Sequence, residues 1–221
     1  MGALAPRDRE GPFGVPIAAV LGAASLAFIA FFALAFAVAA GTDVDRGISS
    51  ILRALDTGPG EAFESGVGVL LGVLPWTLLV LLVSATLWRH HEHTLAALLA
   101  SGVSIEIATS GAKLVFRTLG VSSLNGYPSG HVARIAVTGG ILLLWLVLGD
   151  RRRVVLAGVA IVTAGAILGV GAGRVIGGEH RPVDVAGGVL LALGWVLGIA
   201  ALTLIRRDSL PVPLHAGSEP R

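Results

Sequence analysis

The stretch from Val15 to Ala40 reads VPIAAVLGAASLAFIAFFALAFAVAA and holds no charged residue. A helix needs about 20 such residues to cross a hydrocarbon core about 30 Å thick. The stretch contains Ala37-Val38-Ala39, which resembles a cleavage site, but it is far longer than the roughly 7–15 apolar residues of a secretory signal peptide. The sequence therefore predicts a retained transmembrane helix here.

The composition of the whole chain extends this prediction. Of its 221 residues, 54% are hydrophobic and 14% are charged, whereas a soluble domain carries about 25% charged residues. A soluble enzyme and a disordered chain are therefore excluded. The absence of cysteine removes disulfides, thiolate nucleophiles and cysteine-bound metals. Basic residues do not alternate with aromatic ones anywhere, so no nucleic-acid partner is expected.

Apolar segments of this kind recur along the chain. We predict an all-α polytopic membrane protein, a six-transmembrane-helix bundle forming one integral-membrane domain over 1–221. Its six spans are expected at 15–40, 66–88, 94–116, 131–149, 154–173 and 183–205. The loop at 41–65 is expected to hold a short interfacial helix, and the tail at 208–221 to be flexible.

The basic residues predict the orientation of these spans. Arg89, Arg151–Arg153 and Arg206-Arg207 fall on the same side as Arg7 and Arg9. By the positive-inside rule this side, with both termini, is cytoplasmic. The loops near 41–65, 117–130 and 174–182 are then extracytoplasmic. Only one of the 16 basic residues is lysine, which weakly suggests a bacterium of high G+C content and hence a bacterial inner or plasma membrane.

The loop near 117–130 carries residues suited to binding an anion. Gly130 and His131 begin a predicted helix, whose N-terminal amides attract negative charge. Ser129 precedes them as a helix cap or as a hydroxyl donor to a ligand. Lys113 and Arg117 lie one helical turn apart, so both side chains can reach the same anion.

The loop near 174–182 adds a cation and a possible nucleophile. Arg174 ends one predicted helix, and His180 and Asp184 stand four residues apart where the next begins. A carboxylate at that spacing can fix the imidazole tautomer and leave the other ring nitrogen free to attack. Two histidines among several cations suit phosphoryl transfer.

These residues resemble the motifs of a known family. The run Pro128–His131 resembles the Pro-Ser-Gly-His signature of the type 2 phosphatidic acid phosphatases (PAP2), membrane relatives of the vanadium haloperoxidases. Arg174, five residues, His180, three residues and Asp184 resemble the family's Ser-Arg-x5-His-x3-Asp motif, with Gly173 in the serine position. The family's Lys-x6-Arg-Pro motif is incomplete, because Gly120 stands where the arginine should follow Lys113.

The resemblance implies a role for each matching residue. His180 would be the nucleophile that forms a phosphohistidine, Asp184 would orient it, and His131 would protonate the leaving group. The phosphate-binding residues would be Lys113, Ser129, Gly130 and Arg174, to which we add Arg117 from its helical spacing. The family needs no metal or other cofactor. The substrate would be a lipid phosphate or diphosphate at the outer membrane face.

Simpler interpretations stay open at this stage. His180 and Asp184 could be a structural pair, and Arg174 could reach for lipid phosphates. Glu106 lies inside a predicted span, either protonated, facing a polar cavity or paired, and Arg134 could bind phosphate or pair within the bundle. Arg89–His93, with three histidines and a glutamate, is expected to be a solvated cytoplasmic turn rather than a metal site.

We therefore expect an enzyme, a lipid phosphatase acting on polyprenyl diphosphate, phosphatidate or phosphatidylglycerophosphate. Two alternatives remain: a lipid phosphotransferase, and a non-catalytic protein that binds or transports a lipid phosphate. The expected partners are the lipid substrate and the bilayer, and the oligomeric state is left open.

Overall fold

The computed structural model describes residues 16–40, 44–54, 66, 68–149 and 152–209. These ranges hold helices and no strand. In chain order the helices are α1 (Ile17–Ala39), α2 (Val44–Ala54), α4 (Val73–Arg89), α5 (His93–Gly102), α6 (Ile105–Thr118), the short 3-10 helix η1 (Ser122–Leu124), α7 (Gly130–Leu148), α8 (Arg153–Ile176) and α9 (Pro182–Ser209).

Most of the predicted spans correspond to long apolar helices. Among the described residues, five helical segments are long and apolar enough to cross a membrane, at 17–39, 93–118, 130–148, 153–176 and 182–206. They confirm an all-helical membrane protein. The expected span at 66–88 corresponds to α4, an apolar helix of 17 residues, which rises about 26 Å at 1.5 Å per residue. A sixth crossing by α4 stays a prediction.

The third predicted span is broken into two helices. Helix α5 ends at Gly102 and α6 begins at Ile105, with Ser104 at its start. A Cβ atom on Gly102 would lie 2.6 Å from Ile141 Cδ1, so α5 and α7 approach closely there. The indole Nε1 of Trp195 donates a hydrogen bond of 2.9 Å to Ser104 Oγ. Close packing against α7 and α9 therefore accompanies the break between α5 and α6. The break carries α6 and its polar residues toward the predicted anion-binding residues.

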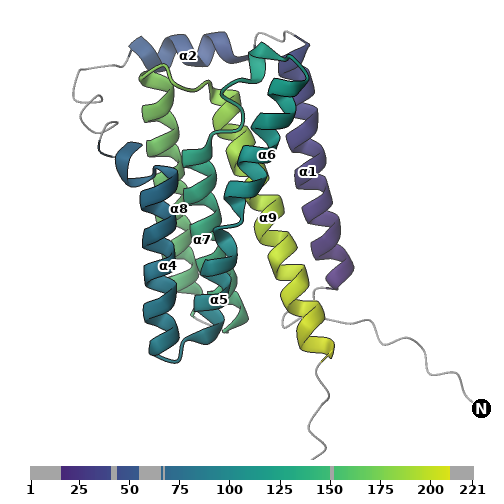
Figure 1. The fold of residues 1–221 in the computed structure, drawn as a ribbon, viewed down its shortest axis with the longest axis vertical. Helices are drawn as coiled ribbons and strands as arrows, with labels where there is room; N and C mark the ends of the chain where they lie inside the picture. Colours follow the sequence, from purple (N-terminus) through teal and green to yellow (C-terminus); the bar gives the residue numbers. More distant parts are fainter. Residues whose placement is uncertain (1–15, 41–43, 55–65, 67, 150–151, 210–221) are drawn as a thin grey trace, which may run out of the picture.

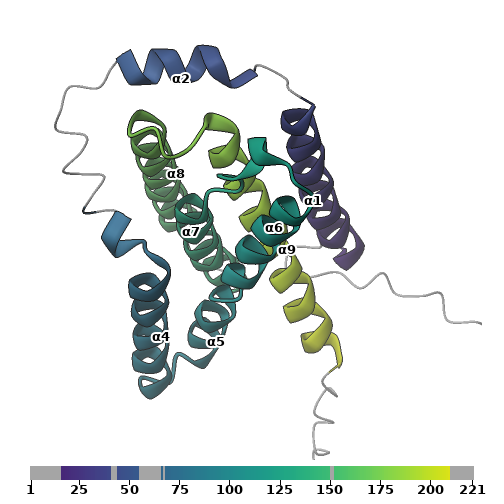
Figure 2. The ribbon, with the colours of Figure 1, turned by 45° about the horizontal axis from the view of Figure 1, so that its top comes forward.

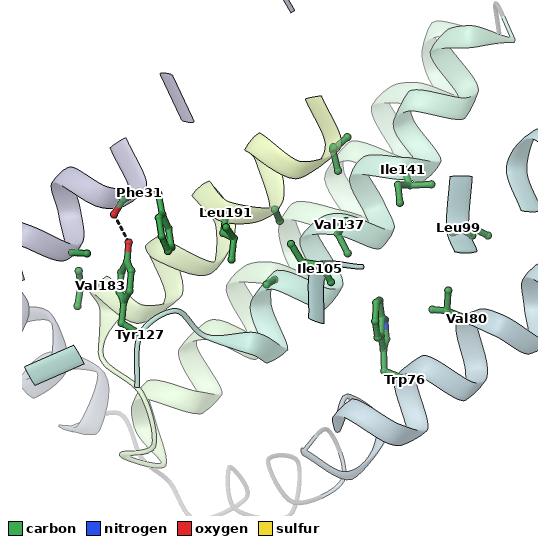
Figure 3. Close-up of a cluster of buried hydrophobic side chains, with 14 of the residues drawn as sticks. Phe31, Trp76, Val80, Leu99, Ile105, Tyr127, Val137, Ile141, Val183 and Leu191 are labelled. Atoms are coloured by element: carbon green, nitrogen blue, oxygen red, sulfur yellow. Dashed lines mark hydrogen bonds between the residues drawn. The ribbon is translucent and has the colours of Figure 1, made fainter. Parts of the chain in front are cut away.

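Helix α9 is the centre of the bundle. It packs along α1 on one side and along α7 on the other, and α8 covers α7 (Figure 2). Figure 3 shows the apolar core along these contacts, including Phe31 and Tyr127. The buried hydroxyl of Tyr127 donates a hydrogen bond of 2.6 Å to the carbonyl of Phe31. A side chain at Gly187 would collide with the Tyr127 ring, so that glycine lets α9 approach the loop before α7.

Helix α2 is the short helix expected in the 41–65 loop. It lies across the end of the bundle where α8 is followed by α9 (Figure 1). Ile48 and Ile51 remain exposed, while Asp45 Oδ1 accepts a hydrogen bond of 3.0 Å from the backbone of Val183 at the start of α9. Residues 41–43 and 55–65 lie outside the described ranges. At the other end α9 continues to Ser209, two residues into the segment expected as a tail, and residues 210–221 are outside the described ranges.

Candidate functional site

The turn after α8 brings Arg174 and His180 to the same end of the bundle. Gly178 adopts a positive φ of 75°. Its N–H donates to the carbonyl of Val175 (3.1 Å), and those of Glu179 and His180 donate to the carbonyl of Arg174 (3.1 and 3.0 Å). Such a glycine-terminated helix end reverses the chain within a few residues. The five-residue interval between Arg174 and His180 is therefore the length of this turn.

His180 and Asp184 lie together at the start of α9. Asp184 Oδ2 accepts a hydrogen bond of 2.8 Å from the backbone N–H of Arg181, as the third residue of a helix does in a capping box. The same oxygen is 3.5 Å from His180 Nδ1. Asp184 is 2% exposed and His180 is 9% exposed. The carboxylate is thus fixed by the backbone and faces Nδ1, which directs the Nε2 atom of the imidazole away from it.

The loop before α7 is tied to this pair. The N–H of Ser129 donates a hydrogen bond of 2.8 Å to the carbonyl of Asp184. A Cβ atom on Gly188 would lie 2.6 Å from the carbonyl oxygen of Ser129, so a glycine is needed where α7 begins against α9. The buried Ser129 Oγ has no hydrogen-bond partner among the described residues. This hydroxyl can therefore serve a ligand at the N-terminus of α7.

His131 lies among cations at the start of α7. Arg174, Arg134 and His180 are all close enough to act on its imidazole electrostatically, and the backbone of Gly68 lies beside it. Arg174 is 8% exposed, and its guanidinium forms an ion pair with Glu179. The two histidines thus face the same polar region from α7 and from the turn before α9.

Gly126 lies directly against His180 and Asp184. A Cβ atom at this position would lie 2.6 Å from Asp184 Oδ2 and 3.3 Å from His180 Nδ1. Reasoning from the sequence missed this residue. Its nearness to the Pro-Ser-Gly-His run was the signal available, but the sequence alone does not show which side chains a turn glycine faces.

Helix α6 contributes Lys113 and, less directly, Arg117. Lys113 is partly buried, and Asp184, Arg134, Arg117 and Glu106 act on it electrostatically. Lys113 therefore lies within electrostatic range of both Asp184 and the Glu106 and Arg134 side chains, whereas Arg117 is exposed in the last turn of the helix.

Gly120, which occupies the arginine position of the family motif, ends α6. Its φ is 71°, its N–H donates to the carbonyl of Arg117 (3.0 Å), and the N–H of Val121 donates to that of Phe116 (3.2 Å). This is again a glycine-terminated helix end. The departure from the family motif therefore has a structural reason, because a left-handed residue is needed there.

Glu106 and Arg134 pair with each other inside the bundle. Arg134 Nε donates to Glu106 Oε1 (2.6 Å), and Nη2 donates to Oε2 (2.8 Å). The remaining Nη1 donates to the carbonyl of Leu71 (2.6 Å). This arrangement decides between the alternatives left open by the sequence. Arg134 pairs within the bundle, with a carboxylate and a backbone carbonyl, and Glu106 is paired with Arg134.

Two ionisable groups outside the spanning segments have shifted pKa values. Burial raises the pKa of the Tyr127 phenol. Burial also raises the pKa of Asp45, and the hydrogen bond from Val183 opposes this shift only in part. Arg181 Nε lies 4.0 Å from Asp45 Oδ2, so α2 is joined to the start of α9 by a partly shielded polar contact.

The histidine-rich stretch Arg89–His93 lies far from this site. It forms the turn between α4 and α5, at the opposite end of the bundle from α2 (Figure 1). His91 has a φ of 65°, and residues 89–93 are exposed. Over the described ranges, no group of three or more His, Asp or Glu side chains is arranged to hold a metal ion.

Part of the chain matches a known protein family. Residues 109–208 match the family model described as the PAP2 superfamily. The matched region runs from α6 to α9 and includes Lys113, the Ser129–His131 run, Arg174, His180 and Asp184. No curated protein and no solved structure matches the chain.

Proposed function

We propose, from the membership of residues 109–208 in the PAP2 superfamily, that this membrane protein is a lipid phosphatase. Membership indicates a phosphoric-ester hydrolase at the family level. The finer proposal is that the chain hydrolyses a lipid phosphate or diphosphate through a phosphohistidine. The observation that carries it is the buried contact of 3.5 Å between His180 Nδ1 and Asp184 Oδ2, next to a serine hydroxyl that has no hydrogen-bond partner among the described residues.

In the proposed first step, His180 Nε2 attacks the phosphorus atom. The N–P bond forms while the P–O bond to the lipid breaks, and His131 donates a proton to the leaving oxygen. Asp184 holds the imidazole orientation and stabilises the positive charge that develops on the ring. A water molecule then attacks the phosphohistidine, the N–P bond breaks, and His131 accepts the proton of the water as inorganic phosphate leaves.

The phosphoryl oxygens need several donors during this reaction. We assign them to Lys113, Arg174, the Ser129 hydroxyl and the Gly130 amide at the N-terminus of α7, since positive charge placed before the reaction stabilises the transition state. Arg117 is proposed as a further cation at the rim, in place of the arginine missing from the first motif.

The site is proposed to face the extracytoplasmic side of a bacterial inner or plasma membrane, with both termini cytoplasmic. This assignment combines the positive-inside rule with six spans, α4 being the sixth. The substrates proposed are polyprenyl diphosphate, phosphatidate and phosphatidylglycerophosphate, with the diphosphate first because an outward-facing site suits the recycling of that carrier.

Phosphate release by the purified protein in detergent tests this function. The panel is the three lipids in the presence of EDTA, comparing wild type with His180→Ala and with His90→Ala, a histidine in the exposed turn at the opposite end. Release should survive EDTA, fall below about 3% of wild type in His180→Ala and be unchanged in His90→Ala. Full activity in His180→Ala would exclude the nucleophile assignment.

Two alternatives are separated in the same assay. A phosphotransferase would transfer the phosphoryl group from His180 to an added lipid acceptor, which product analysis detects. A non-catalytic binding or transport protein would bind the lipids without releasing phosphate, and His180→Ala would not change this.

A further inference from the structure

An apolar cavity of about 420 Å³ lies beside the polar site. Its walls come from α4, α5, α7 and α8, with Trp76, Val80, Leu99, Leu142 and Ala166 among them. The volume falls within the range of about 300–1,000 Å³ that small-molecule pockets occupy. Helix α4 packs mainly on α5, and Figure 2 shows it standing apart from α8.

The cavity continues the face of α7 that begins at His131. Ile135, Thr138 and Leu142 line it, and they follow His131 by four, seven and eleven residues. Residues at these intervals share one face of a helix. The rise from His131 to Leu142 is about 16 Å. One helix face therefore carries the histidine at its outer end and the apolar wall below it.

The segment before α4 joins the polar site to the cavity. A Cβ atom on Gly68 would lie 3.4 Å from Arg174 Nη1. Three residues later, the carbonyl of Leu71 accepts the hydrogen bond from Arg134, and Leu71 also lines the cavity. The site and the cavity are therefore neighbours across a single turn of chain.

The Thr138 hydroxyl in the cavity wall already has a hydrogen-bond partner. Thr138 Oγ1 donates a hydrogen bond of 2.8 Å to the carbonyl of Arg134, so its hydroxyl is engaged within α7. The other lining side chains are apolar apart from Thr163. Such a wall favours a hydrocarbon ligand, which gains free energy for every methylene group removed from water.

We propose that this cavity binds the hydrocarbon chain of the lipid phosphate whose head group occupies the polar site. The proposal rests on the proposed function and specifies how the substrate lies: the phosphate at His131 and Arg174, and the chain along α7 between α4 and α8. The residues that line the cavity would then select among lipids by their hydrocarbon chains, while the reaction at the phosphate would take place at His180.

Trp76 provides a direct probe, because bromine atoms on a lipid chain quench indole fluorescence on contact. We would measure quenching in His180→Ala protein, so that binding is observed without turnover. A phosphatidate with brominated chains should quench the Trp76 emission, defined as the signal lost in Trp76→Phe. Brominated phosphatidylcholine at the same concentration should quench it much less.

Two matched substitutions on α8 test the cavity itself. Ala166 lines it, whereas Ala164 is exposed on the same helix. Ala166→Phe should abolish the phosphatidate-specific quenching, and Ala164→Phe should preserve it. In the active protein, Ala166→Phe should lower kcat/KM for a long-chain lipid phosphate about tenfold and leave hydrolysis of nitrophenyl phosphate within about twofold.

Each other result has a definite meaning. Equal quenching by both brominated lipids would show that bulk bilayer lipid fills the cavity and would overturn the proposal, as would absence of Trp76 quenching. Specific quenching without phosphate release by wild type would support the chain site while removing the proposed catalytic function. An equal loss of activity on the lipid and on nitrophenyl phosphate in Ala166→Phe would contradict a role in chain binding.

Discussion

Gly126 and Asp184 are so close that a Cβ atom on residue 126 would lie 2.6 Å from Asp184 Oδ2. The same Cβ atom would lie 3.3 Å from His180 Nδ1. Asp184 cannot withdraw freely, because its carboxylate accepts the N–H of Arg181 (2.8 Å) and its side chain is 2% exposed. The absence of a side chain at Gly126 therefore leaves the space that the Asp184 carboxylate and the His180 imidazole occupy.

We expect Gly126→Ala to lower kcat about tenfold to a hundredfold, because small displacements of a catalytic group cost this much. The methyl group would push Asp184 or His180 out of alignment. Gly111→Ala is the matched control, since a Cβ atom on Gly111 in α6 meets nothing within 4 Å. Phosphate release and thermal unfolding in detergent should be measured on both variants. Unchanged kcat in Gly126→Ala would show that the pair tolerates the displacement.

Removing one partner of the Glu106–Arg134 pair should destabilise the protein strongly. Their side chains are 15% and 6% exposed, so Glu106→Gln leaves a buried, uncompensated guanidinium. Breaking a buried pair in this way costs about 3–5 kcal/mol. We expect a clear fall in the melting temperature of Glu106→Gln in detergent.

The double variant Glu106→Leu with Arg134→Met is the comparison for that experiment. Replacing both charges by apolar groups of similar volume is often close to neutral, so much of the lost stability should return. A double variant less stable than Glu106→Gln would mean that the bond from Arg134 to the carbonyl of Leu71 matters more than the ion pair.

Much of the fold follows from sequence because hydropathy is a property of single segments. The expected span at 131–149 and the helix Gly130–Leu148 differ by one residue at each end. The break between α5 and α6 was not predictable in this way, because it accompanies a tertiary contact between Gly102 and Ile141. The contact between His180 and Asp184 was predictable from their spacing at a helix start, although His180 itself lies two residues before α9 begins at Pro182.

Contacts between distant segments explain what the sequence left open in the site. Glu106 and Arg134 are 28 residues apart and come from different helices, so nothing local pairs them. Gly126 is recognisable as a turn residue, but its contact with Asp184 exists only after α9 packs beside the loop. Gly120 seemed a gap in a motif, whereas its positive φ shows that it ends α6.

Placing the arginine of the PAP2 motif at position 120 should not increase the proposed activity. With φ at 71°, Gly120→Arg places a side chain in the left-handed region, at a cost of about 1–2 kcal/mol. We expect lower thermal stability and no gain in kcat/KM. Gly120→Asn is the comparison, because asparagine tolerates that region better than arginine. A stable and more active Gly120→Arg would indicate that the first motif is truly incomplete.

Asp45 should make stability depend on pH at the end of the bundle covered by α2. Burial raises the pKa of its carboxyl above the ordinary value of 3.8, so the folded chain holds this proton more tightly than the unfolded chain. The contribution of this group is therefore most favourable below about pH 4 and declines as pH rises through the folded-state pKa.

Asp45→Asn keeps an oxygen for the N–H of Val183 and removes the ionisation. We expect the melting temperature of the variant relative to wild type to rise between about pH 4 and pH 7 and then to level off. The opposite trend would mean that the ion pair with Arg181 outweighs burial.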